Sequence, residues 1–473
     1  MQTTHEYYGA MHALLAQMRA RGGSDLFITA GFPPAIKLDG KLTPLAGAAL
    51  DAQQAAGYVR AVMNERQAAE FASSREANFA ISPDGLGRFR VSAFVQMGQA
   101  GMVLRLINTA IPTLDGLGLP AILQDIVMSK RGLVIMVGAT GCGKSTTLAA
   151  MVGHRNAHSQ LDYALERGIN FIDTAEMYPV MASAQTQGST ERHIGSWLKK
   201  SGRRGDIVLA SKIAGPNSRM HWIRKGKTDH DAANIRAAVE GSLRRLQTEH
   251  IDLYQLHWPS RNLPIFGASV YNPRKEHACV AIEDTLAVLG KLVEEGKIGH
   301  IGVSNESSWG VCEYIKQAEL KGLPRIASIQ NLYNLTARHF ETSLLDETCH
   351  RENVSLLAYS PLAFGQLTAK YLDDPQAKGR LTRFPAGWSP RYVRPATIEA
   401  ARQYAALARA HGLTPAQLAL AWCYTRWFVA STIIGATSVA QLQQNIDAHE
   451  VSLSPELVAA VDAIHASAPN PGQ

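Results

Sequence analysis

The alternation of hydrophobic and polar positions changes its rhythm near residue 160. Before that point, stretches such as LFITA and GRFRVSAFVQ carry apolar residues at every second position, which predicts strands of an antiparallel sheet. They follow HEYYGAMHALLAQMRARG, whose apolar residues recur every three or four positions and predict a helix that ends at Gly22-Gly23. Residues 1–110 are therefore predicted to form a small α+β domain.

After residue 161, amphipathic stretches of helix length alternate with short apolar runs. The runs are INFID, IVLASK, IDLYQLHW, IGHIGVSN, IASIQN, VSLLAYS and STIIGA. Strands that alternate with helices pair in parallel, and this spacing is typical of a (β/α)8 barrel with one unit unaccounted for. Residues 161–473 are predicted to be a TIM-type α/β barrel that lacks its native first strand.

Residues 111–160 lie between these regions and carry a phosphate-binding motif. The apolar run LVIMV predicts a buried strand, and STTLAAM predicts the start of a helix. Between them, the pattern GxxxxGK[ST] is matched by Gly138-Ala-Thr-Gly141-Cys-Gly143-Lys144-Ser145. The glycines let backbone amides face phosphate oxygens, Lys144 would reach the β and γ phosphates, and Ser145 would bind Mg²⁺ if a nucleotide were present. This segment is predicted to be a partial P-loop NTPase unit.

Composition and charge argue against a nucleic-acid-binding protein, a disulfide-rich protein and a membrane-spanning protein. The formal net charge of +7 is modest for 473 residues, so we expect no nucleic-acid partner. The five cysteines are scattered without CxxC spacing, which argues for a reducing compartment and against a zinc site or a disulfide framework. No apolar run approaches the length of a membrane span, and we expect a cytoplasmic protein with no metal site of its own.

The first part of the chain resembles a motor ATPase family. Together with SDLFITAGFPPAIKLDGKLTPL, the phosphate loop makes residues 1–158 similar to the type IV pilus retraction ATPases of the PilT/PilU-like twitching motility branch. The resemblance implies a PAS-like domain over residues 1–110, through which the chain would meet pilus-motor ATPase subunits. The acidic pair and the Asp- and His-box elements of that family are missing after HRNAHSQ, so we expect no ATP hydrolysis. Retention of the strand and helix for packing is the favoured interpretation, and weak binding of ATP with Mg²⁺ is the alternative.

Polar residues follow three successive predicted barrel strands. Asp173 ends the strand in FIDTAEMY, and Tyr178 follows five residues later. Lys212 ends the next strand, at ASK, and His257 ends the strand after that, at LYQLH. The C-terminal ends of barrel strands meet at one rim, where the active sites of such barrels are built. Each residue alone has a structural explanation, such as a strand-end cap, but the four in this order indicate one site.

With these motifs, residues 161–473 resemble the aldo-keto reductases, especially their NADP(H)-dependent Tas-like branch. The resemblance implies that Tyr178 protonates a carbonyl oxygen, that Lys212 lowers the pKa of Tyr178, that Asp173 holds Lys212, and that His257 orients the carbonyl. It also implies NADP(H) contacts along the chain at Ser304, Asn305, Gln330, Tyr359, Ser360, Leu362, Gly365, Lys370, Gly435, Thr437, Gln441, Gln444 and Asn445. The preference for NADP(H) rests on the resemblance, since no Arg or Lys lies between Gly435 and Asn445.

The sequence thus joins parts of two enzymes. LDYALERG keeps the end of the reductase family's first helix, and the strand before it is replaced. We predict that residues 133–137 take the vacant first position of the barrel, between the strands at 169–173 and 431–435, because an open barrel would expose two strand edges. The helix would continue from Lys144 to Arg167. Three interpretations stay open: a reductase of small aldehydes or ketones, a nucleotide-binding or motor-associated assembly protein without turnover, and a non-functional chimeric product.

Overall fold

The computed structural model describes most of the chain outside the segment around the phosphate loop. The described residues are 4–38, 41–45, 47–107, 114, 117, 119, 123, 144–217, 219–268, 270–384 and 389–473. Gly138, Gly141 and Gly143, the predicted strand at 133–137 and the side chains of Lys144 and Ser145 lie outside them. The chain divides into two compact units, residues 1–110 and 111–473, and the three-segment division predicted from the sequence stays a prediction.

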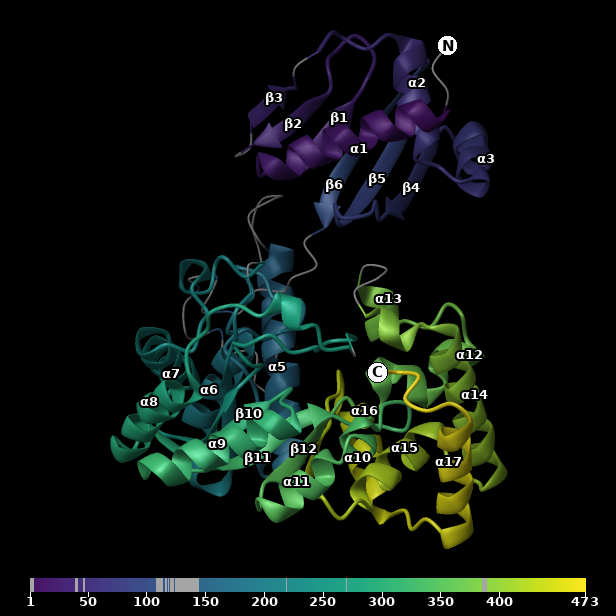
Figure 1. Cartoon of the computed structure of the whole chain (residues 1–473). Helices are drawn as coiled ribbons and strands as arrows, with labels where there is room; N and C mark the ends of the chain where they lie inside the picture. Colours follow the sequence, from purple (N-terminus) through teal and green to yellow (C-terminus); the bar gives the residue numbers. More distant parts are fainter. Residues whose placement is uncertain are drawn as a thin grey trace. The chain divides into compact units, whose positions relative to one another are not determined.

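The first unit is an antiparallel sheet with three helices (Figure 1). Its strands run in the order β3-β2-β1-β6-β5-β4. Leu15 and Met18 of the first helix are buried in one core with Leu26 and Leu104 of the sheet. The elements are α1 Thr4–Ala20, β1 Asp25–Ile28, β2 Ala35–Leu38, β3 Lys41–Pro44, α2 Ala52–Ala61, α3 Glu65–Ser74, β4 Glu76–Ile81, β5 Arg88–Gln96 and β6 Gln99–Ile107.

Among its described residues, the second unit contains a parallel seven-stranded sheet in the order β13-β12-β11-β10-β9-β8-β7. Each strand falls on one of the apolar runs identified in the sequence. The nearly closed sheet fits a (β/α)8 TIM barrel, so the predicted fold class is confirmed. The strands are β7 Phe171–Asp173, β8 Val208–Ile213, β9 Ile251–Leu256, β10 Ile298–Ser304, β11 Ile326–Leu332, β12 Ser355–Tyr359 and β13 Val429–Ile433.

Helices surround this sheet, and local signals set their ends (Figure 1). Asp231 caps one helix by accepting a hydrogen bond from the Asn234 amide, and Gly322 ends another in the left-handed conformation. No helix in the described ranges is long and apolar enough to cross a membrane. The helices are α5 Lys144–Glu166, α6 Ser189–Ser201, α7 Ala232–Leu246, α8 Ile282–Glu294, α9 Ser308–Lys321, α10 His339–Thr342, α11 Leu345–Arg351, α12 Lys370–Asp373, α13 Arg380–Arg383, α14 Pro395–Ala410, α15 Pro415–Tyr424, α16 Val439–Asp447 and α17 Pro455–Ser467.

Helix α5 packs between α6 and α16, the helices that follow the two edge strands β7 and β13. Ala164 is buried against two apolar side chains of α16, and Asp162 accepts a 2.7 Å hydrogen bond from the indole of Trp197 in α6. This is the place of the first helix in a (β/α)8 barrel. The helix is continuous, as the sequence predicted. The pairing of the strand before it lies outside the described residues and stays a prediction.

Candidate active site

A buried ion pair stands at the C-terminal end of the first two described barrel strands. Asp173 is the last residue of β7, and Lys212 lies near the end of β8. The Lys212 Nζ atom donates to Asp173 Oδ2 over 2.6 Å and to the Thr174 carbonyl over 2.7 Å. The Lys212 side chain is fully buried, so its charge depends on these partners.

Tyr178 and His257 complete the group of four predicted residues. The Lys212 Nζ atom lies 5.2 Å from the centre of the Tyr178 ring. The Tyr178 and His257 rings meet edge to face, with 5.5 Å between their centres. The structure therefore brings all four side chains together at the C-terminal rim. Their catalytic roles stay a prediction.

Burial decides the protonation of the two aromatic groups. It raises the pKa of Tyr178, and the charge of Lys212 lowers that pKa by a smaller amount. The net effect differs from the lowered pKa expected from the sequence, because desolvation of the phenolate outweighs the neighbouring ammonium. Burial, followed by the Lys212 charge, lowers the pKa of His257 well below its usual value. A protonated phenol and a neutral imidazole thus face each other at neutral pH.

The residues predicted to hold the nicotinamide lie on the same rim. The Asn305 side chain donates to the His257 carbonyl over 2.9 Å, and the Tyr359 hydroxyl donates to Asn305 Oδ1 over 2.7 Å. Ser304 donates to the Gln330 carbonyl over 2.7 Å. These bonds connect the ends of β10, β11 and β12 to His257, which directly follows β9.

The loop after β12 holds the residues predicted near the pyrophosphate. The Gly365 amide donates to the Leu362 carbonyl over 2.8 Å. Gly365 has a φ of 94°, and a Cβ there would come within 2.9 Å of the Lys370 side chain. The positive φ is what favours glycine at this turn, because the Lys370 side chain is flexible and could move away from a Cβ. Ser360, at the start of the loop, has a φ of 57° and accepts a 3.0 Å hydrogen bond from Asn334.

The last predicted group lies at the N-terminus of α16. Gln441 accepts hydrogen bonds from both the amide and the hydroxyl of Thr437, over 3.0 and 2.9 Å. Asn445 is buried and donates to the Gly435 carbonyl over 3.3 Å, and Gln444 is exposed. The group forms one capped turn after β13, and none of these contacts reaches the four residues above.

Two residues that act on this group of four were not identified from the sequence. Gln255 on β9 and Gln330 both donate to Asp173 Oδ1, over 3.1 and 3.0 Å, and fix the carboxylate that holds Lys212. A glutamine inside the apolar strand IDLYQL was the available signal. Arg380, on the short helix α13, lowers the pKa of Tyr178 through its charge. Nothing in the local sequence marks Arg380.

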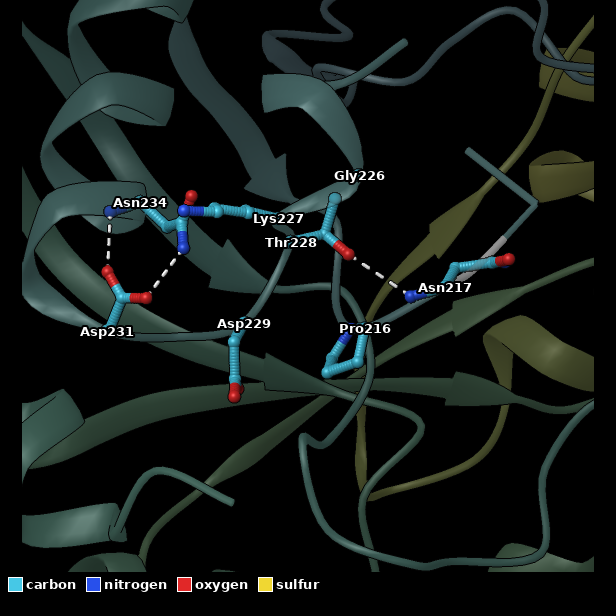
Figure 2. A pocket seen from close by; sticks show the side chains of 8 residues that line it. All are labelled: Pro216, Asn217, Gly226, Lys227, Thr228, Asp229, Asp231 and Asn234. Carbon is cyan, nitrogen blue, oxygen red and sulfur yellow. Dashed lines mark hydrogen bonds between the residues drawn. The ribbon is translucent and has the colours of Figure 1, made fainter. Parts of the chain in front are cut away.

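Two pockets, of about 370 and 330 Å³, open elsewhere on this unit, and neither is lined by the four predicted catalytic residues. Figure 2 shows the larger one, in which Asp231 bonds Asn234 and the Asn217 amide bonds the Thr228 hydroxyl. Asp231, Asn234 and Thr228 thus find hydrogen-bond partners within the lining itself. This pocket is lined by Pro216, Asn217, Gly226, Lys227, Thr228, Asp229, Asp231 and Asn234.

Comparison with known proteins finds relatives of both parts of the chain. The model of the Aldo/keto reductase family matches residues 135–466. Protein tas of Escherichia coli is 43% identical over 329 residues, which cover 70% of this chain and 94% of that protein. An aldo-keto reductase of Babesia bovis is 39% identical over 259 residues, covering 52% and 90%. The type IV pilus ATPase PilU of Pseudomonas aeruginosa is 57% identical over 228 residues, covering 46% and 57%. The two resemblances seen in the sequence are therefore confirmed.

Proposed function

The chain belongs to the aldo/keto reductase family, and from this premise we propose that its barrel reduces a small aldehyde or ketone with NADP(H). The observation that supports this most directly is the buried pair of Lys212 and Asp173 beside the ring of Tyr178. Burying an ion pair is costly, and an apolar pair would often stabilise the fold better. Its position at a barrel rim therefore favours a chemical role.

Tyr178 is the proton donor in this proposal. Burial raises its pKa, which keeps the phenol protonated at neutral pH. The ammonium of Lys212 stabilises the phenolate that remains after the proton has moved to the carbonyl oxygen. Asp173 holds Lys212 in place through the 2.6 Å bond. His257, kept neutral by burial, orients the carbonyl by hydrogen bonding.

NADP(H), when bound, supplies the hydride. The residues present fit its nicotinamide end, because Asn305 and Tyr359 are joined to each other and to the backbone of His257 at the same rim. The buried Nδ1 atom of His257 has no hydrogen-bond partner in the described part of the chain, as expected where a ligand completes a site. The choice of NADP(H) over NAD(H) rests on the family alone.

The test is NADPH oxidation by the purified full chain with a panel of small aldehydes, followed by NADPH absorbance. Tyr178→Phe should lower kcat by about 100-fold or more, because it removes the donated proton. NADPH affinity, measured by fluorescence quenching, should stay unchanged. Tyr271→Phe is the matched control, since Tyr271 is exposed and lies outside the site. A wild-type chain that binds NADPH and turns over no carbonyl would refute the proposal.

A second function is supported by the similarity to PilU. In this alternative, residues 1–110 attach the chain to pilus-motor ATPase subunits without ATP turnover. An intact retraction ATPase should then retain the full chain on a column, and a chain without residues 1–110 should pass through. Equal retention of both, or of neither, would argue against this function. A chain that fails this test and the reductase test would fit the third interpretation, a non-functional chimera.

A further inference from the structure

The smaller pocket, of about 330 Å³, lies among the loop after β9 and the N-terminal parts of α8 and α9. Its lining includes His230, Ser260, Arg261, Cys279 and Trp309. None of the residues in its lining belongs to the predicted catalytic or cofactor groups. Its volume is within the range of small-molecule sites, roughly 300 to 1,000 Å³.

Two buried polar atoms of this lining lack partners. His230 is only 1% exposed, and its Nε2 atom has no hydrogen-bond partner within the described residues. The same holds for the buried hydroxyl of Ser260. Buried polar groups are nearly always paired, so two unpaired atoms on residues of one pocket offer hydrogen bonds that a ligand there could complete after a small side-chain shift. Burial lowers the pKa of His230 to about 4, so the imidazole is neutral at pH 7.

An aromatic side chain forms another part of the wall. Trp309 is 59% exposed, yet its ring is held by the Arg261 guanidinium, which lies 4.9 Å from the ring centre. Arg261 is in turn paired with Glu306 over 2.8 Å, so its charge is already balanced. An exposed, fixed indole is a stacking surface for another ring. The two carboxylates of the lining, Glu283 and Glu313, are likewise paired, each with a lysine. The balanced charges and the neutral imidazole favour a ligand without net charge.

We propose that this pocket binds a small neutral aromatic molecule that carries a hydroxyl or amide group. Its ring lies against Trp309, and its polar group bonds His230 and Ser260. The site is separate from the proposed carbonyl reduction and does not depend on it.

Cys279 provides the test, because this exposed thiol lines the pocket. Phenol at millimolar concentration should slow alkylation of Cys279 by iodoacetamide at least threefold, as measured by peptide mass spectrometry. Cys312 is also exposed but lies outside the lining, so its rate should not change. Cyclohexanol, which has the hydroxyl but no aromatic ring, should protect less. Equal slowing at both cysteines, or at neither, would overturn the proposal.

Variants distinguish ligand binding in the pocket from nonspecific effects on the reactivity of Cys279. Trp309→Ala should abolish the protection of Cys279, and Ser260→Ala should weaken it. Trp427→Ala is the matched control, because Trp427 is 65% exposed and lies outside the lining. Circular dichroism would check that each variant is folded. Full protection in Trp309→Ala would contradict the proposed stacking surface.

Discussion

Three histidines gather where α5 meets α6, and we predict that they make the stability of the barrel depend on pH. We call His154, His158 and His193 the junction histidines. The rings of His154 and His158 lie 4.1 Å apart, and those of His154 and His193 lie 5.9 Å apart. His158 also bonds the Ser196 hydroxyl over 2.9 Å. The nearby charges of Arg192 and Lys200 are positive, which makes protonation still less favourable.

The direction of the effect follows from the pKa values. Burial, and then the neighbouring histidines, lower the pKa of His158 to about 3 and that of His193 to about 4. The unfolded chain therefore binds more protons below pH 6.5, and stability that is complete above this pH is lost as the pH falls toward 3 to 4. For a fully buried imidazole, the step from pH 7.5 to 5.5 costs about 1.4 kcal/mol. Since His193 is only partly buried, we expect roughly 2 kcal/mol for the two together.

The assay is urea unfolding of the full chain followed by tryptophan fluorescence. All seven tryptophans lie beyond residue 190, so the signal reports on the barrel unit alone. Between pH 7.5 and 5.5, the wild type should lose about 2 kcal/mol more than the double variant His158→Gln/His193→Gln. His300→Gln is the control, since His300 is exposed on β10 and should leave the difference unchanged. The same pH dependence in the wild type and the double variant would refute the reasoning.

Three further changes test other parts of the molecule. Lys144→Ala should leave ATP hydrolysis at background, and Mg²⁺-dependent turnover that is lost in this variant would show a working ATPase. Asp162→Ala should lower the free energy of unfolding by about 1 kcal/mol, because the buried Trp197 indole loses its hydrogen bond, and urea unfolding measures this. Asp173→Asn should lower kcat at least tenfold and the free energy of unfolding by about 3 kcal/mol, because the buried Lys212 loses its counter-charge. Unchanged kinetics in this variant would show that the ion pair has a structural role only.

The strands and the four rim residues could be predicted because their signals are local. Each apolar run identified after residue 161 overlaps one of the barrel strands, and the residues at the C-terminal ends of these strands share a rim. The length of α5 was also readable, because no Pro interrupts the stretch from Lys144 to Arg167. Parallel topology then brings Asp173 and Lys212 together without further information.

The energetics of the site could not be read in the same way. The net pKa of Tyr178 depends on how completely neighbouring segments exclude water, and this is a property of the packed barrel. The support of Asp173 by Gln255 needs the register of three strands, which no local pattern states. The pocket beside Trp309 combines residues from position 230 to position 317, and only folding places them together.

Helix α5 explains how two unrelated sequences can share one barrel. Its first part belongs to the ATPase-like segment, and there Asn156 donates to the Thr437 carbonyl at the start of α16 over 3.0 Å. Its second part is reductase-like, and there Ala164 is buried against the same helix. Both parts of α5 thus contact the α16 region of the barrel. The family match begins at residue 135, inside the apolar run that precedes the phosphate loop. A barrel position requires a strand that can be buried on both faces and a helix with one apolar side, whatever their ancestry. Helix α5 meets the requirement for the helix, since its apolar side packs against α16. That residues 133–137 supply the matching strand stays a prediction.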